Sequence, residues 1–181
     1  MSVLFGLPAH PLLVHLTVVV IPLAALLAMV VAGFLRVPGL IKLTAFVLGA
    51  LSVALVPPME SSGKALEKVP DSAAVERHAQ LGETLLPWVI GLLIAIVAVL
   101  AADRWLRPAR PGGSATSGAG RFRLASRVVT VGVAVTAIAV AAGTLVQTVR
   151  IGHSGAQATW SSPAAATPGP NQVDRGEHGE R

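Results

Sequence analysis

The chain has 181 residues and contains no cysteine. This absence excludes disulfide bonds, zinc sites built on thiolates, iron–sulfur clusters and covalently attached c-type haem. The ligands that remain for a metal or a haem iron are imidazole, carboxylate and the methionine thioether. The sequence also lacks a Ser/His/Asp set, a phosphate-binding loop and a nucleotide motif. It therefore gives no support for a hydrolase, a kinase or another ordinary enzyme.

Charged residues are scarce: they make up 13% of the chain, against 53% hydrophobic residues, and the mean hydropathy is +0.70. A soluble domain of this size is far less apolar. Four runs carry no charge at all, namely residues 12–35, 43–59, 84–102 and 128–149. A helix that rises about 1.5 Å per residue needs about 17–25 such residues to cross the hydrocarbon core of a bilayer. The runs lack the strict alternation of barrel strands, so we expect helices.

These runs predict an all-α, polytopic membrane protein built as an antiparallel bundle of four transmembrane helices. The expected membrane domain covers residues 1–160, with helices at about 12–35, 41–59, 72–105 and 127–151. Residues 161–181 are polar and broken by several prolines and glycines. We expect this tail to be disordered, because it holds too few apolar residues to pack.

The distribution of lysine and arginine predicts the orientation. The first connection carries Arg36 and Lys42, whereas the second mixes acids and bases. The third holds six arginines and the single acid Asp103. Basic connections stay in the cytoplasm, so we expect a multi-pass protein of the bacterial inner membrane with both termini extracytoplasmic. The run PGGSATSGAG in the third connection predicts a flexible linker lying against lipid, and not a nucleic-acid reader.

This topology places every histidine of the chain on the outer side: His10, His15, His78, His153 and His178. His10 precedes Pro11, which suits a helix start, and His15 follows about one turn later. His78 lies about 9 Å above the apolar run of its helix. Glycines flank His153, and they allow the close approach of a neighbouring helix or of a flat ligand. His178 lies in the tail and is not expected to be a ligand.

The same junctions carry a resemblance. The segments FGLPAHPLLVH, ESSGKALEKVP followed by ERHAQLGETLLPW, and VQTVRIGHSGAQATW resemble a family of bacterial membrane proteins, domain of unknown function 2231 (DUF2231), in its actinobacterial branch. The resemblance covers residues 5–160 and implies a four-helix membrane domain. The family comes with no activity, so the functional prediction depends on the residues themselves.

The first functional hypothesis is a redox or ligand-binding module that holds b-type haem or a transition metal (copper, zinc or iron) at the outer end of the bundle. Histidines on separate helices can supply axial ligands, and arginines can neutralise haem propionates. The candidate residues for a cofactor are His15, His78, His153, His10, Arg150 and Arg77. For a metal ion the candidates are His15, His78, His153 and Glu83.

Two other hypotheses stay open. In the second, the protein is a structural or partner-binding membrane subunit, and its histidines only form a polar lid; His10 then caps a helix, and Arg150 anchors at headgroups or pairs with Glu83. The third is a transporter or proton channel, which the lack of acids and bases in the middle of the helices argues against. The expected partners are the lipid bilayer and either a membrane redox partner or a second copy of the chain. No nucleic acid is expected.

Overall fold

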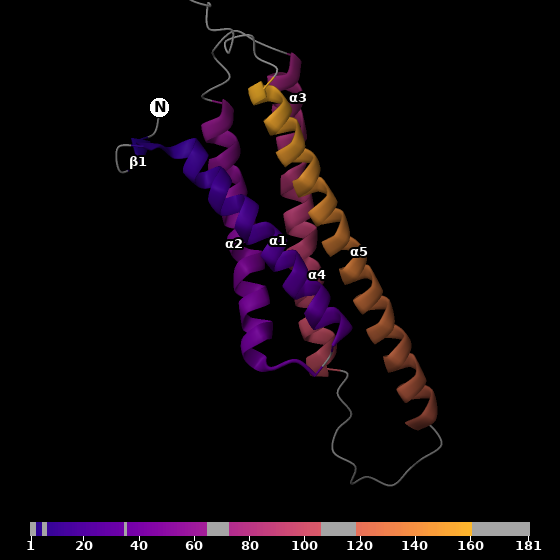
Figure 1. Ribbon diagram of the computed structural model, residues 1–181. Coiled ribbons are helices and arrows are strands. Elements are labelled where there is room, and N and C mark those ends of the chain that lie inside the picture. Colours follow the sequence, from indigo (N-terminus) through magenta and orange to yellow (C-terminus); the bar gives the residue numbers. More distant parts are fainter. Residues whose placement is uncertain (1–2, 5–6, 35, 65–72, 106–118, 161–181) are drawn as a thin grey trace, which may run out of the picture.

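A computed structural model describes residues 3–4, 7–34, 36–64, 73–105 and 119–160, and helices account for nearly all of them (Figure 1). The helices are α1 (Ala9–Gly33), α2 (Gly39–Lys64), α3 (Ala73–Glu83), α4 (Leu85–Trp105) and α5 (Ala119–Trp160). Two strands of two residues each, β1 (Val3–Leu4) and β2 (Leu7–Pro8), pair antiparallel before α1.

Four helical segments are long and apolar enough to cross a membrane: Leu12–Gly33, Gly39–Gly63, Ala73–Trp105 and Leu124–Gln157. The prediction of an all-α, multi-pass membrane bundle is therefore confirmed. α1 packs against α2 and α5, and α4 packs against the same two helices. The short helix α3 lies at one end of the bundle and packs mainly on α5 (Figure 1).

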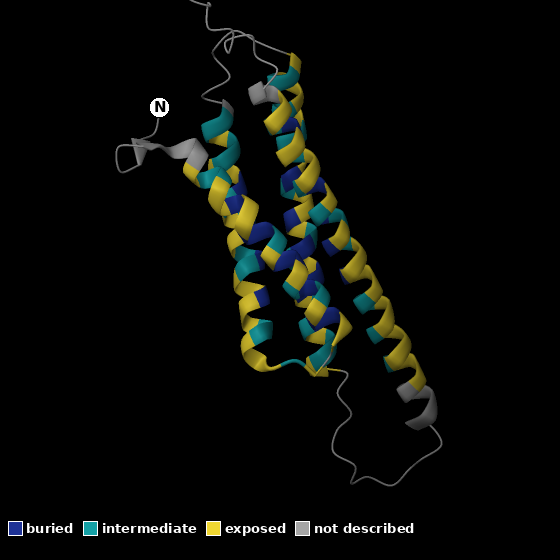
Figure 2. Ribbon diagram, viewed as in Figure 1, coloured by how far each residue is buried: buried dark blue, intermediate teal, exposed yellow. Residues whose placement is uncertain are grey.

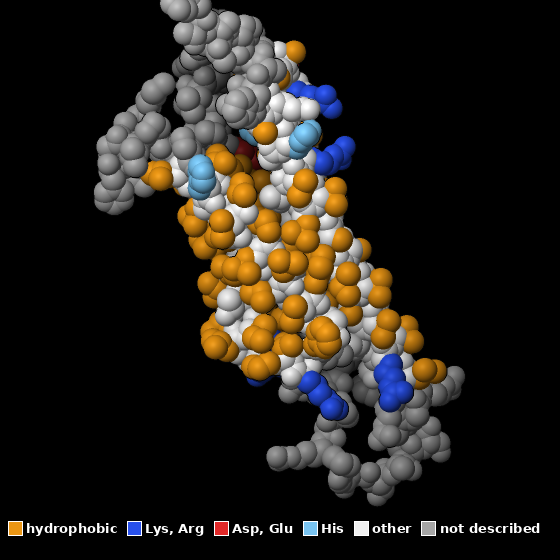
Figure 3. Space-filling view, in the orientation of Figure 1, with side chains coloured by type: hydrophobic (Ala, Val, Ile, Leu, Met, Phe, Trp, Pro, Cys, Tyr) orange, Lys and Arg blue, Asp and Glu red, His pale blue; other side chains and the backbone are white. Residues whose placement is uncertain are grey.

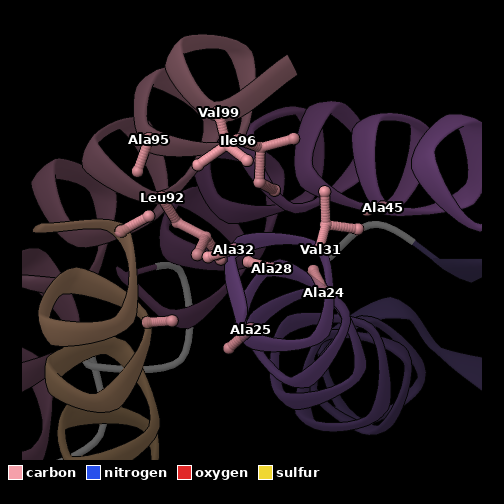
Figure 4. Close-up of a cluster of buried hydrophobic side chains, with 12 residues drawn as sticks. Ala24, Ala25, Ala28, Val31, Ala32, Ala45, Leu92, Ala95, Ile96 and Val99 are labelled. Atoms are coloured by element: carbon pink, nitrogen blue, oxygen red, sulfur yellow. The ribbon is translucent and has the colours of Figure 1, made fainter. Parts of the chain in front are cut away.

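The core of the bundle is built from small side chains. Ala24, Ala28 and Ala32 of α1 are buried against Leu92 and Ile96 of α4 (Figure 4). Without a hydrophobic driving force between helices in lipid, close backbone approach through small residues provides much of the packing energy. A second cluster nearer to α3 contains Ile21, Val56, Leu85 and Val89.

The outward faces of the four spans are exposed and almost entirely apolar (Figures 2 and 3). This pattern suits a surface covered by lipid. Hydroxyl groups inside the bundle donate to helix carbonyls four residues earlier: Thr17 to Leu13 at 2.7 Å, and Thr144 to Val140 at 2.8 Å. Such bonds satisfy polar groups that water cannot reach.

The helix expected at 72–105 is interrupted at Thr84, and this interruption separates α3 from α4. The amide and the hydroxyl of Thr84 both donate to the carbonyl of Leu81, at 3.2 and 2.6 Å, and this tightens the chain into a turn. Pro87 has no N–H, so it cannot donate to the carbonyl of Glu83 as a continuous helix would require.

Two helices are longer than expected. α2 continues through Pro57 and Pro58 to Lys64, and α5 runs from Ala119 to Trp160 instead of from 127 to 151. The apolar run marks the part of a helix that suits lipid, but a helix can continue into water where its residues favour it. The predicted disordered tail, with His178, lies outside the described residues, as does most of the third connection.

The bundle has two chemically different ends. One end is formed by the start of α1, the end of α2, α3 and the end of α5, and we call it the histidine end. The other end is formed by the turn between α1 and α2, the end of α4 and the start of α5, and we call it the basic end. The described residues on either side of the two predicted basic connections lie at the same end, because successive spans run antiparallel (Figure 1).

Candidate functional site at the histidine end

Histidine side chains lie at the edge of the apolar surface, and an acidic side chain is recessed among them (Figure 3). The described histidine side chains come from three helices: His15 of α1, His78 of α3 and His153 of α5. His10 lies in the first turn of α1, but its side chain is outside the described part of the structure. The antiparallel fold thus brings these three residues to one end of the molecule, as expected.

His78 is tied to α5. Its Nδ1 lies 3.0 Å from Oγ of Ser154, which is buried. The single hydroxyl proton of Ser154 is already donated to the carbonyl of Ile151 at 2.8 Å. With the hydroxyl proton in this position, Ser154 accepts a hydrogen bond from Nδ1 of His78, and in that tautomer the lone pair of the ring is on Nε2.

Gly155 lets the imidazole of His78 lie directly against α5. A Cβ at this position would come within 3.0 Å of Cε1 of His78 and 3.4 Å of its Nδ1. An alanine here would require the ring to move. The flanking glycine noted in the sequence therefore permits close approach, but the group that approaches is a histidine of the same chain.

His15 and His153 differ from His78 in their surroundings. Both are exposed, whereas His78 is partly buried. Nε2 of His153 lies 3.2 Å from Nε2 of Gln157, one turn further along the same helix. This contact engages Nε2 of His153 with a side chain of its own helix.

The charged residues of this end are distributed around the histidines. Glu60 of α2 has a buried Oε1 atom, whereas Glu83 is exposed at the end of α3. Arg77 and Arg150 are both exposed. They are accessible to an anionic group on a partner or ligand.

A partly buried polar bridge near His78 was missed by the sequence analysis. Gln147 of α5 is buried, and its side-chain amide donates to the hydroxyl of Thr84 at the interruption between α3 and α4. Ser154 lies seven residues after Gln147, on the same face of α5. A lone amide at the end of an otherwise apolar run was the signal that could have identified this face.

The predicted metal ligands do not form a ligand group in the structure. Among the described residues, no three of histidine, aspartate and glutamate are placed so that they could hold a metal ion. In this part of the structure His15 and His153 are exposed, whereas His78 contacts α5. Comparison of the chain with protein-family models, curated proteins and solved structures gave no match.

Proposed function

We propose that the protein is a structural or partner-binding subunit of the bacterial inner membrane, and that its histidine end is a polar lid. The observation that carries this proposal is the hydrogen bond from His78 to Ser154. It uses the imidazole to connect α3, which lies beyond the apolar run, to the end of α5. The bridge from Gln147 to Thr84 supports the same connection one level deeper.

A lid of this kind gives α3 a defined position on the bundle. Its outward residues, among them Glu76 and Arg77, then form with Arg150 of α5 a polar surface with charges of both signs. The partner is a membrane protein with a complementary polar surface, or a second copy of this chain. Removing the lid contact is expected to release α3 and weaken partner binding, while the transmembrane core remains packed.

The second candidate function is binding of b-type haem or a transition metal at His78. The orientation of the ring favours it, because ligating histidines almost always donate their other ring N–H to a neighbouring group. His78 would supply Nε2, with His15 or His153 as a second ligand, and Arg77 or Arg150 would meet propionates. A haem iron needs only one or two imidazole ligands from the protein, so fewer of the described residues have to come together than for a bare metal ion. When bound, haem would supply one-electron exchange with a redox partner.

An optical spectrum and metal analysis of the purified protein, prepared with haem and metals supplied, separate the two functions. The lid proposal expects a colourless, metal-free protein, in which His78→Ala and Ser154→Ala lower stability alike. The cofactor proposal expects a Soret band that shifts on reduction, or a bound metal. Ser154→Ala would then weaken binding about 10–100-fold, as loss of an orienting partner does. His153→Ala leaves the contact of His78 with Ser154 in place, so it would weaken cofactor binding if His153 is the second ligand and would leave the lid intact.

We also propose that the basic end is cytoplasmic and that both termini are extracytoplasmic. We further propose that the chain belongs to the DUF2231 family, because of the segments within residues 5–160 that resemble it. The charge difference between the two ends supports this orientation. A reporter fused after Arg181 should be active only if it works outside the cytoplasm. Activity of a cytoplasm-dependent reporter at that position would reverse the orientation.

A further inference from the structure

The basic end carries an excess of positive charge that its own acid does not offset. Lys42 at the start of α2 forms an ion pair with Asp103 at the end of α4, and each side chain is only 14% exposed. Asp103 is the only acid among the described residues of this end. The exposed charges left there are all positive: Arg36, Arg104 and Arg127.

Large apolar side chains project beside these arginines. Trp105 follows Arg104 directly and is 80% exposed, which is the highest value among the large hydrophobic side chains that the structure describes. Phe34, Leu40 and Leu124 are also strongly exposed at this end. A tryptophan next to arginines at the margin of an apolar surface is typical of the headgroup level of a bilayer.

We propose that the basic end binds anionic phospholipid, with Arg104 and Arg127 contacting the headgroup phosphate. The two arginines stand at the end of α4 and near the start of α5, and both are exposed at the basic end. Guanidinium groups bind phosphate oxygens through paired hydrogen bonds. The exposed residues of α5 beyond Arg127, beginning with Val128 and Val131, provide the apolar surface for the acyl chains.

The pairing of Asp103 argues for a lipid site and not only for an insertion signal. Orientation during insertion depends on the number of lysines and arginines near a span, and acids contribute little to it. A bound phosphate is repelled by a free carboxylate nearby. The ion pair removes that repulsion next to Arg104, because Lys42 neutralises the carboxylate one residue before it.

The histidine end differs from the basic end in the sign of its exposed charges. Its exposed arginines, Arg77 and Arg150, share that end with the acids Glu60, Glu76 and Glu83. Mixed charge of this kind does not select anionic over neutral lipid. Arg150 is therefore a matched control for Arg127, since both are exposed arginines of α5 at opposite ends of its apolar run.

Fluorescence of Trp105 can test the proposal in vesicles. The full chain carrying Trp88→Phe and Trp160→Phe is reconstituted into phosphatidylcholine that contains a small fraction of brominated lipid, either phosphatidylglycerol or phosphatidylcholine. Bromine quenches only nearby indoles. We expect the brominated anionic lipid to quench Trp105 more strongly than the neutral one at equal fraction, and this preference to fall as salt is raised.

Arg104→Gln and Arg127→Gln should each lower the preference about fivefold, the effect of one basic residue near an anionic surface, while Arg150→Gln leaves it unchanged. Equal quenching by the two lipids would overturn the proposal. An equal loss in Arg150→Gln would also overturn it, because the effect would then reflect net charge alone. If the tryptophan variants fail to fold, native mass spectrometry of the unaltered chain from mixed-lipid micelles measures the same preference through retained phosphatidylglycerol.

Discussion

The two halves of α5 both carry many apolar residues but differ in packing. Residues 124–136, toward the basic end, are rich in valine, and none of them is buried (Figure 2). Residues 137–157, toward the histidine end, contain buried positions at regular helical spacing: Ala137, Ala141, Thr144, Gln147 and Ser154. The difference shows that small and polar residues on one helical face, and not apolarity, mark the packed part of a membrane helix.

The neighbours of α5 explain this difference. The packed half meets the ring of Trp88 on α4, and further along it meets α3 through His78. At the basic end, the described ion pair of Lys42 with Asp103 connects α2 to α4 and does not involve α5. The helices α2 and α4 are therefore held together there, while α5 keeps a surface for lipid. Variants in each half can test this division.

The largest effect is expected from Gly143→Ala in the packed half. A Cβ at this position would lie 2.2 Å from Cζ3 of Trp88, so the indole or the whole of α4 must move. Overpacking of this kind is expected to lower the free energy of unfolding by about 3 kcal/mol. Unfolding in mixed micelles, followed by circular dichroism, measures the loss.

Gly132→Ala is the control in the exposed half of the same helix. No atom lies within 4 Å of a Cβ placed there, and alanine favours helix over glycine by up to about 1 kcal/mol. This variant should be neutral or slightly more stable. If both glycine variants destabilise the protein equally, the two halves of α5 do not differ as described.

A smaller effect is expected from Lys42→Ala at the basic end. It leaves the carboxylate of Asp103 in a mostly buried position without its cation. The loss should be about 2 kcal/mol, between the values for exposed and fully buried ion pairs. The double variant Lys42→Ala with Asp103→Ala should recover much of this stability, because no buried charge remains. A double variant as unstable as the single one would mean that the ion pair is not the cause.

The smallest effect is expected from His78→Ala at the histidine end. Loss of its hydrogen bond to Ser154 should cost about 1 kcal/mol, and the effect should concentrate in α3. Hydrogen exchange of residues 73–83 should rise while that of α4 stays low. His153→Ala removes only a contact within α5 and should leave the exchange of α3 unchanged. Equal exchange in the two variants would argue against His78 as the connection between α3 and α5.

Much of the fold could be predicted because each segment that crosses a bilayer must be long enough and free of charge, and both properties can be read along the sequence. The charge-free runs gave the number of spans and their order, and lysine and arginine placed the two basic connections at one end. The helix limits were predicted less well, since α3 separates from α4 at Thr84 and α5 is much longer than its apolar run. These features depend on Pro87, on side-chain hydrogen bonds and on the contact of α5 with α3.

The candidate site shows the same limit. Antiparallel order was enough to predict that His15, His78 and His153 share one end, since helices that begin or end at one membrane surface must meet there. The direction in which each ring points was not predictable from spacing. His78 of α3 contacts Ser154 of α5, whereas His153 contacts Gln157 of its own helix, and only the packing of α3 against α5 decides the first of these contacts.

The sequence by itself determined that the chain is a bundle of four membrane-spanning segments with one basic end and one histidine-bearing end, because the cost of placing charge in hydrocarbon acts on each residue independently of its neighbours. Only the tertiary structure decided which imidazole is tied to another helix, that Lys42 neutralises Asp103, and which half of α5 is packed. These outcomes depend on distances between residues far apart in the chain, and packing sets those distances.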